Sequence, residues 1–426
     1  MNQPDSTRST VGDSTGDGGV VLLAGGCWTD GGGRSDRTEI LVRDGRIERV
    51  GTVPKAAAPG ARVVDLSDRT LLPGFIDCHV HTTVDPSALL AGGTKLSPTQ
   101  LALATLPVLT TILDHGFTTV RDLATFALDP VTLHLRDAVA SGTVTGPRMI
   151  VAPHLISARG GHGDLSASVI ASVRAREIVA VADGPAEIAS RVRQEIRAGA
   201  DWVKFGATGG FGSPSDDPTQ TTYSQEEMNV LVATARDLGV PCTPHAYGDE
   251  GVQRAVHAGV RSIEHGNLAS AQTLRLMSER GIYLVPTQYM VADALANLDD
   301  NSYWEGKAQQ ERDKFRRYED RLRESAQNVA DSNVSIAFGT DIGMFPHSEA
   351  WREFPTMVAN GISAERALRA ATSVAADLLQ RQDLGRLEPG AVADVIAVDG
   401  DPLADIEATG RVAFVMRGGR LHRSPE

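Results

Sequence analysis

Cysteine is scarce in this sequence, which has three among 426 residues: Cys27, Cys78 and Cys242. An odd number of widely spaced cysteines cannot form a disulfide framework, and it favours a reducing compartment. Basic residues are also in the minority, with 41 lysines and arginines against 54 aspartates and glutamates. The formal net charge of −13 argues against a nucleic-acid partner, because such a partner requires a basic surface.

Long apolar runs are absent as well. No run reaches the roughly 18 residues that a membrane-spanning helix needs, so we expect no membrane partner. Residues 1–19 are rich in Ser, Thr, Gly and Asp and contain no apolar core of the signal-peptide kind. We therefore interpret residues 1–19 as a disordered tail and expect a cytoplasmic protein.

Short alternating strands and tight turns occupy both ends of the remaining chain. Asp44-Gly45 predicts a hairpin turn near the start, and Gly418-Gly419 predicts another near the end. We interpret residues 20–70 and 386–426 as one small β-sandwich domain built from both ends. Two separate additions to the edge of a larger domain are the alternative.

Between these ends, apolar strands alternate with amphipathic helices, which is typical of a parallel α/β fold. The predicted strands are 71–80, 118–123, 148–156, 201–207, 241–247, 261–265, 282–287 and 335–341. The predicted helices are 98–115, 130–141, 185–199, 224–238, 250–258, 271–280, 303–331 and 363–380. Eight such units predict a (β/α)8 TIM-type barrel over residues 71–385, with its chemistry at the carboxyl ends of the strands.

Two predicted strands carry side chains that are unusual for an apolar core. The first ends in His79-Val80-His81, where both imidazoles point to the same side, although such a pair also arises by chance. Lys204 interrupts the fourth, and burying an ammonium without a partner costs several kcal/mol. Lys204 is either ion-paired or extended toward solvent, or burial lowers its pKa so that the neutral amine adds carbon dioxide.

Three further strands end in side chains that can bind a metal. His245, His265 and Asp341 follow strands five, six and eight. Each taken singly is compatible with a hydrogen-bonded core histidine or a helix-capping carboxylate. Together with the first and fourth strands, however, they bring imidazoles, a carboxylate and a potential carbamate to one rim. This set of ligands suits a pair of divalent ions such as Zn²⁺.

At this point the sequence resembles the amidohydrolase superfamily, from about Val20 onward. The matching segments are LLPGFIDCHVH, DWVKFGATGG, PHAYG, SIEHG and FGTDIG. Within it, the sequence is similar to the branch of bacterial Xaa-Pro-type dipeptidases and ochratoxin-degrading amidases. The resemblance implies that His79, His81 and Asp341 bind the more buried metal ion. It implies that His245 and His265 bind the second.

The resemblance also implies that carbamylated Lys204 bridges the two ions, and that a hydroxide between them attacks the substrate carbonyl. Asp341 would then take the proton of that hydroxide and pass it to the leaving amine. His162, in the glycine-rich segment RGGHGD, is a candidate to polarise the carbonyl, and Tyr247 is a candidate to stabilise the oxyanion. A loop histidine and a packed tyrosine are the plainer interpretations.

The predicted substrate is a small-molecule amide, either a dipeptide or an N-acyl amino acid, and relatives of this branch are commonly homo-oligomers. The alternatives are a cyclic amidase, a deaminase or an imidazolonepropionase-like hydrolase, and Lys204 argues against the last two because they work with one metal. A non-enzymatic scaffold is disfavoured because all six ligand positions are present.

Overall fold

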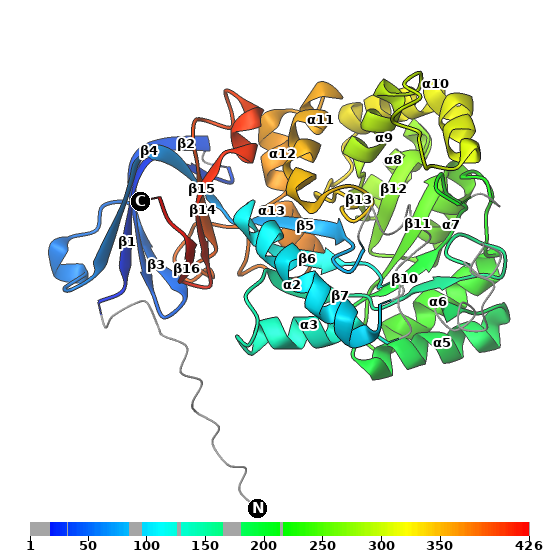
Figure 1. The fold of residues 1–426 in the computed structure, drawn as a ribbon, viewed down its shortest axis with the longest axis horizontal. Helices are drawn as coiled ribbons and strands as arrows, with labels where there is room; N and C mark the ends of the chain where they lie inside the picture. Colours follow the sequence, from blue (N-terminus) through cyan, green and yellow to red (C-terminus); the bar gives the residue numbers. More distant parts are fainter. Residues whose placement is uncertain are drawn as a thin grey trace, which may run out of the picture.

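The computed structural model describes residues 18–31, 33–84, 96–125, 129–164, 180–213 and 216–425. The predicted disordered tail therefore lies outside the described residues, except for Gly18 and Gly19. The chain has the α/β architecture that the sequence predicts (Figure 1). Within the described ranges, no helix combines the length and the apolar composition needed to cross a bilayer.

The described strands are β1 (Val20–Thr29), β2 (Gly33–Arg43), β3 (Arg46–Val50), β4 (Arg62–Pro73), β5 (Phe75–Val80), β6 (Phe117–Asp122), β7 (Arg148–Val151), β8 (Leu155–Ser157), β9 (Ala180–Val181), β10 (Val203–Gly206), β11 (Cys242–Gly248), β12 (Ser262–Leu268), β13 (Tyr283–Val285), β14 (Val395–Val398), β15 (Val412–Arg417) and β16 (Arg420–Arg423). The described helices are η1 (Lys55–Ala57), α2 (Pro98–Asp114), α3 (Val131–Ala140), α5 (Gly184–Ala198), α6 (Gln225–Asp237), α7 (Asp249–Ala258), α8 (Ala271–Glu279), α9 (Gln288–Ala296), α10 (Gln309–Asp331), η3 (His347–Arg352), α11 (Glu353–Ala359), α12 (Ala364–Ala370), α13 (Ser373–Leu378) and η4 (Ile406–Gly410).

Both chain ends contribute to one seven-stranded sheet, in the order β16-β15-β14-β4-β1-β2-β3. The sequence pattern predicted a sandwich of two sheets, whereas the described strands form one. The reason is that the long strand β4 pairs with β1 and, through residues 70–73, also with β14. The β1–β4 register shifts between Ala24 and Gly26, where β4 has the additional residues 67–69, and Gly25 is required there because a Cβ would lie 2.1 Å from the carbonyl oxygen of Ser67.

The strands in the middle of the chain form two parallel sheets. One has the order β13-β12-β11-β10-β8-β9 and the other β5-β6-β7. A backbone hydrogen bond links the two sheets: Asp201 N, two residues before β10, donates to Val151 O, the last residue of β7 (2.8 Å). The segment 335–342 lies between β13 and β5, because Leu284 N donates to Ser335 O (2.9 Å) and Cys78 N donates to Phe338 O (2.8 Å).

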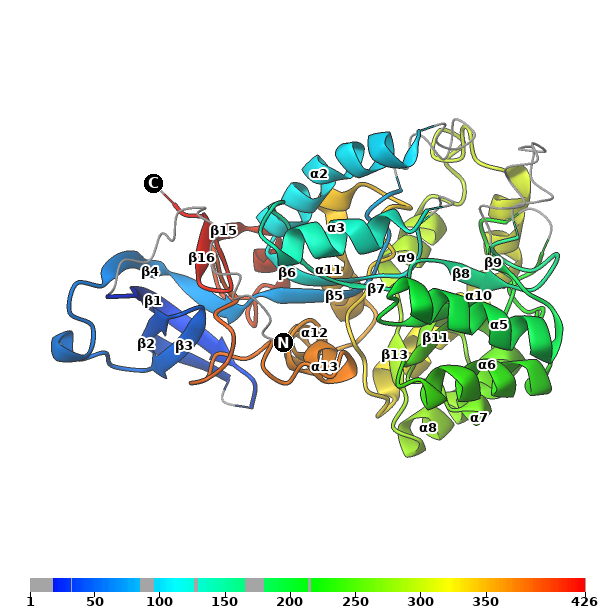
Figure 2. The same cartoon turned by 90° about the horizontal axis from the view of Figure 1, so that it is seen from below.

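Helices cover the outer side of these parallel strands, as Figures 1 and 2 show for α5, α6, α7 and α8. The apolar stripe predicted for the helix 185–199 is confirmed, since α5 buries Ile188 and Val192 against the strands and Ile196 packs partly buried on the same core. Helix α6 begins at Ser224, whose hydroxyl accepts from Glu227 N in a capping box. Local sequence therefore determines where several of these helices begin and which face they bury.

Two predicted elements are divided in the structure. The predicted helix 363–380 becomes α12 and α13, because the carbonyls of Ala370 and Ala371 accept hydrogen bonds from Phe338 N (2.9 Å) and Ile76 N (2.8 Å) instead of continuing a helix. The predicted strand 148–156 becomes β7 and β8. In addition, α9 lies between the predicted strand 282–287 and the predicted helix 303–331, where no helix was predicted from the sequence.

Candidate metal centre

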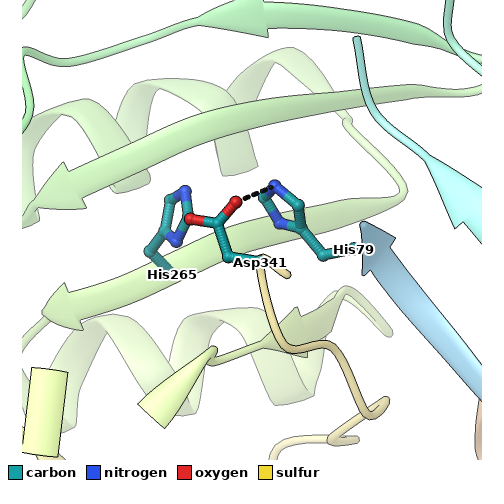
Figure 3. Close-up of side chains that lie close together, drawn as sticks. All are labelled: His79, His265 and Asp341. Carbon is teal, nitrogen blue, oxygen red and sulfur yellow. Dashed lines mark ion pairs between the residues drawn. The ribbon is translucent and has the colours of Figure 1, made fainter. Parts of the chain in front are cut away.

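The predicted ligands come together at the carboxyl ends of the parallel strands. His79 is on β5, Lys204 on β10, His245 on β11 and His265 on β12, and Asp341 follows the segment that lies beside β5. Parallel strands end at a common edge, so residues far apart in the sequence meet there. Figure 3 shows His79, His265 and Asp341 pointing toward one another from three different segments.

His79, His265 and Asp341 are close enough to hold one metal ion. One potential ligand atom from each residue lies within 4.8 Å of the others, and all three side chains are buried. Asp341 Oδ1 lies 3.4 Å from His79 Nε2 (dashed in Figure 3) and 3.2 Å from His81 Nε2. The carboxylate of Asp341 therefore reaches both imidazoles of the His79-Val80-His81 pair.

The backbone is strained at two of these positions. His265 has φ +72° and Asp341 has φ +64°, a left-handed conformation that is uncommon outside glycine. A backbone hydrogen bond from Asp341 N to His79 O (2.7 Å) helps to hold Asp341 in it. Strain of this kind persists where the surroundings enforce it, and it is concentrated at functional sites. Here it turns both side chains toward the centre of the candidate site.

A row of stacked rings surrounds His265. The ring centroids of His245 and His265 lie 4.6 Å apart, and the ring of Tyr247 stacks on His265 at 4.7 Å with an interplanar angle of 10°. His162 stacks on the other face of the group, 3.9 Å from His245. The structure therefore brings the two predicted substrate-contacting residues, His162 and Tyr247, against the predicted ligands of the second metal ion.

Lys204 is buried, with 3% of its surface exposed, and its Nζ atom has no hydrogen-bond partner among the described residues. Burial lowers the pKa of Lys204 to about 8, although the charges of Glu264 and Asp341 act in the opposite direction. A buried, unpartnered ammonium is costly, whereas the same position suits a group that is neutral or modified to an anion. Because the whole Lys204 side chain is buried, the interpretation in which it extends toward solvent is disfavoured.

The imidazoles of His79, His245 and His265 are held in the neutral form that metal binding requires. Burial, helped by the Lys204 charge, lowers the pKa of His79 well below its usual value and that of His265 to about 3. Burial and the neighbouring His162 lower the pKa of His245 in the same way. The pKa of His81 is raised instead, because its bond to Asp341 outweighs its burial.

His162 belongs to a small polar group at the rim. Its Nδ1 atom lies 3.0 Å from Ser213 Oγ and 3.7 Å from Asp216 Oδ2. Lys314 of α10 anchors this group, because its Nζ donates to Gly210 O (2.8 Å) and to Ser213 O. The long helix α10 thus holds the segment beside His162.

An aromatic cluster lies next to the ring row. Phe211 contacts Tyr247 edge-to-face (4.9 Å between centroids) and stacks on Phe315 of α10 at 4.4 Å. Trp304 contacts the same Phe315 ring (5.9 Å). This places a buried aromatic cluster beside the candidate site.

Sequence reasoning missed the buried charges beneath the site. Glu264 and Arg121 are both 0% exposed, and Arg121 Nη2 donates to Glu264 Oε1 at 2.6 Å. Asp77 is also buried, and it accepts hydrogen bonds from His79 N (3.0 Å) and Thr340 Oγ1 (2.6 Å). The sequence did contain a signal for Arg121, Glu264 and Asp77, because each is a charged residue inside an apolar strand, as Lys204 is. What the sequence could not show is which of these charges meet.

Comparison with known proteins agrees with this geometry. The family model described as the Amidohydrolase family matches residues 70–422, which span both the candidate ligands and the carboxyl-terminal strands. The chain belongs to the amidohydrolase family. This amidohydrolase is 29% identical over 441 residues to the ochratoxinase of Aspergillus niger, a match that covers 98% of this chain and 90% of the relative.

Two solved structures extend the comparison of this amidohydrolase. An Xaa-Pro dipeptidase with bound methionine in its active site has a TM-score of 0.87 and 31% identity, and the match covers 95% of this chain and 100% of the other. A prolidase complexed with N-methylphosphonate-L-proline has a TM-score of 0.83 and 32% identity, covering 95% and 99%. The family and branch predicted from the motifs are confirmed, and the protein is a hydrolase that acts on C–N bonds.

Proposed function

We propose that this amidohydrolase uses two divalent metal ions to cleave the amide bond of a dipeptide or an N-acyl amino acid, including aromatic amides of the ochratoxin type. The observation that carries the proposal is the buried Lys204 Nζ, which has no hydrogen-bond partner among the described residues. In the same site, ligand atoms of His79, His265 and Asp341 lie within 4.8 Å of one another. Neutral imidazoles, one carboxylate and a lysine without a counter-ion form a site that needs both cations and a further anion to be balanced.

The arrangement of the parallel strands supports a reaction centre at their carboxyl ends. In our proposal the two parallel sheets and the segment 335–342 form one closed (β/α)8 barrel over residues 71–385, and residues 20–70 with 386–426 form the second domain. Support comes from the backbone bonds Asp201 N to Val151 O and Cys78 N to Phe338 O, which link the sheet edges. In such barrels the carboxyl ends of the strands carry the active site.

The ligand assignment follows the contacts. His79 and His81 share the carboxylate of Asp341, so we assign these three residues to one ion. His245 and His265 have adjacent rings, and we assign them to the second. Two divalent ions, for which imidazole and carboxylate ligands favour zinc, would polarise the amide carbonyl and make water nucleophilic near neutral pH.

Lys204 becomes the bridging ligand after carbamylation. The neutral amine attacks the carbon of carbon dioxide, an N–C bond forms as one C=O π bond opens, and one proton leaves the nitrogen. The product is an anion with two oxygens, so the side chain changes from neutral to a net charge of −1. Burial favours this step because it lowers the pKa of Lys204 to about 8 and so increases the fraction of neutral amine.

Three side chains of this protein then act on the substrate. The neighbouring imidazoles hold the pKa of the Asp341 carboxyl well below its usual range despite its burial, so Asp341 is ionised. It can accept a proton from the attacking water and deliver it to the leaving amine. His162 stacks on His245 and Tyr247 stacks on His265, and in our proposal both donate hydrogen bonds to the carbonyl oxygen as its negative charge develops.

The choice of substrate rests on two observations. Ochratoxinase and the Xaa-Pro dipeptidase, to which this chain is similar, give the substrate class in their names, and both names point to an amide that joins an amino acid. The aromatic cluster of Phe211, Tyr247 and Phe315 provides an apolar surface beside the site. Aromatic rings interact favourably with such a surface, so we favour an aromatic group on one side of the amide.

The test combines metal analysis with a substrate panel. Protein purified after growth with ample zinc should contain close to two divalent ions per chain by elemental analysis. It should hydrolyse dipeptides or aromatic N-acyl amino acids. A protein with no bound metal would indicate the scaffold alternative, and activity confined to cyclic ureas, lactones or phosphotriesters would show that the substrate class is wrong.

A further inference from the structure

Glu264 contacts His79 on the side away from the candidate metal position. Its Oε2 atom lies 2.9 Å from His79 Nδ1, while His79 Nε2 faces Asp341 Oδ1 at 3.4 Å. The imidazole therefore lies between two carboxylates, one beneath the site and one in it. Glu264 is 0% exposed and belongs to β12, one residue before His265.

Three hydrogen-bond donors fix the Oε1 oxygen of Glu264. Its Oε1 accepts from Arg121 Nη2 (2.6 Å), from Ser262 Oγ (3.0 Å) and from Thr243 Oγ1. Arg121 is itself fully buried and donates through Nε to Cys78 O at 2.6 Å. Charge-assisted bonds of this kind are strong and hold the carboxylate in one rotamer.

The Oε2 oxygen of Glu264 has no hydrogen-bond partner among the described residues, and the same is true of His79 Nδ1. The two atoms are within hydrogen-bonding distance of each other but are not aligned for a bond. A buried carboxylate oxygen needs a donor, and the His79 imidazole lies within hydrogen-bonding distance of Oε2. The geometry thus favours the tautomer with the proton on Nδ1.

We propose that Glu264, held by Arg121, is a positioning residue that places the proton of His79 on Nδ1 and so presents the Nε2 lone pair to a divalent cation. Metal-binding histidines are commonly oriented by a carboxylate on their other nitrogen, and this contact fixes both the tautomer and the ring. The inference rests on the proposed function, because it assigns Glu264 to the same metal site. It goes further by identifying why this buried ion pair lies beneath that site.

A purely structural role is the competing explanation. Arg121 and Glu264 join β6 to β12, and the Arg121 bond to Cys78 O adds β5, so the pair would stabilise the sheet without any metal. The Arg148–Asp394 pair provides a matched comparison. Arg148 Nη1 lies 2.6 Å from Asp394 Oδ2, and Asp394 is 3% exposed, at the opposite end of β7 from the candidate site.

The experiment compares Glu264→Gln with Asp394→Asn in the full chain. Zn²⁺ and Co²⁺ affinities are measured by chelator competition, Co²⁺ coordination by its visible absorption, and stability of the metal-free proteins by urea unfolding. Glu264→Gln should lose about 10- to 100-fold in metal affinity and change the Co²⁺ spectrum. Its amide can donate to Nδ1 and so favours the proton on Nε2. Asp394→Asn should be less stable but bind metal as the wild type does.

A second measurement needs no variant at Glu264. The metal-free wild-type protein is labelled with ¹⁵N-histidine, and the His79 signals are assigned by their loss in His79→Gln. Nδ1–H with an unprotonated Nε2 supports the proposal even if Glu264→Gln fails to fold. Nε2–H, or unchanged metal affinity in a folded Glu264→Gln protein, overturns it. A wild-type protein that binds no divalent ion would instead refute the proposed function, so the two failures are distinct.

Discussion

The imidazole of His162 lies parallel to that of His245, with 3.9 Å between ring centroids and 9° between planes. His162 comes from the glycine-rich segment that follows β8, and His245 comes from β11, so the contact forms only in the folded protein. It brings a hydrogen-bond donor to the edge of the candidate metal centre without making that donor one of the assigned ligands.

His162 should therefore matter for catalysis and not for metal binding. We expect His162→Phe, which keeps a stacking ring but removes the donor, to lower kcat by about 10²–10³-fold, the usual loss for one oxyanion donor. Metal content should stay near two ions per chain. Steady-state kinetics on an N-acyl amino acid and elemental analysis of the same sample check this. A His162→Phe protein with near-normal kcat would leave His162 only a packing role.

Asp341→Asn should retain metal but lose most activity. The amide oxygen can still coordinate a cation, but the side chain can no longer accept and deliver a proton. General acid–base catalysis is typically worth about 10²–10⁴-fold, and we expect a loss of kcat in that range. Metal content and single-turnover rates should be measured together. A rate within about threefold of wild type would remove Asp341 from proton transfer.

Lys204 should carry a carbamate in the metal-loaded protein. Incubation with ¹³C-bicarbonate and divalent metal should give a carbamate signal in the ¹³C spectrum that is absent from Lys204→Ala. The same variant should lose metal affinity and activity together, with partial rescue by small carboxylic acids that fit the vacated space. Lys204→Met separates packing from chemistry, because it fills the space without a nucleophile. An unmodified lysine in a fully loaded, active enzyme would contradict the bridging role.

Glu353 should make stability depend on pH. Burial raises the pKa of Glu353 to about 8, with a further contribution from Asp77, although Gln288 N and Tyr289 N donate to its carboxyl group. Between its usual value of 4.5 and about 8, the folded protein holds a proton that the unfolded chain has released. The free energy of unfolding should therefore fall as pH rises through this range, by at most about 1.4 kcal/mol per unit.

Glu353→Gln provides the control for this effect, because an amide does not titrate. Urea unfolding of metal-free wild type and variant, from about pH 6 to about pH 9, should show a smaller decrease for the variant, with a difference on the order of 2 kcal/mol. Parallel pH profiles for the two proteins would mean that Glu353 does not titrate in this range.

Much of the site was predictable from the sequence because its signals are local. A strand places alternate side chains on one face, so His79 and His81 had to point the same way, and parallel strands had to end at one edge. The burial of Lys204 was predictable in the same way, from a charged residue inside an apolar segment. The motifs also identified the family, which the comparisons confirmed.

Other features depended on contacts that no local pattern contains. The carbonyls of Ala370 and Ala371 accept hydrogen bonds from Phe338 and Ile76, and these distant partners end α12 where the sequence favoured a continuous helix. The strand β4 is long enough to pair with both ends of the chain, so one sheet forms where two were expected.

The pairing of buried charges was likewise decided by the tertiary structure. Sequence alone determined that this protein is an α/β amidohydrolase with candidate metal-binding residues at its strand ends, because periodicity and motif order are properties of the chain. That Glu264 lies between Arg121 and His79 depends on the register of β5, β6 and β12 in space. Electrostatic interactions fall off over a few ångströms, so only the folded backbone decides which charges act on each other.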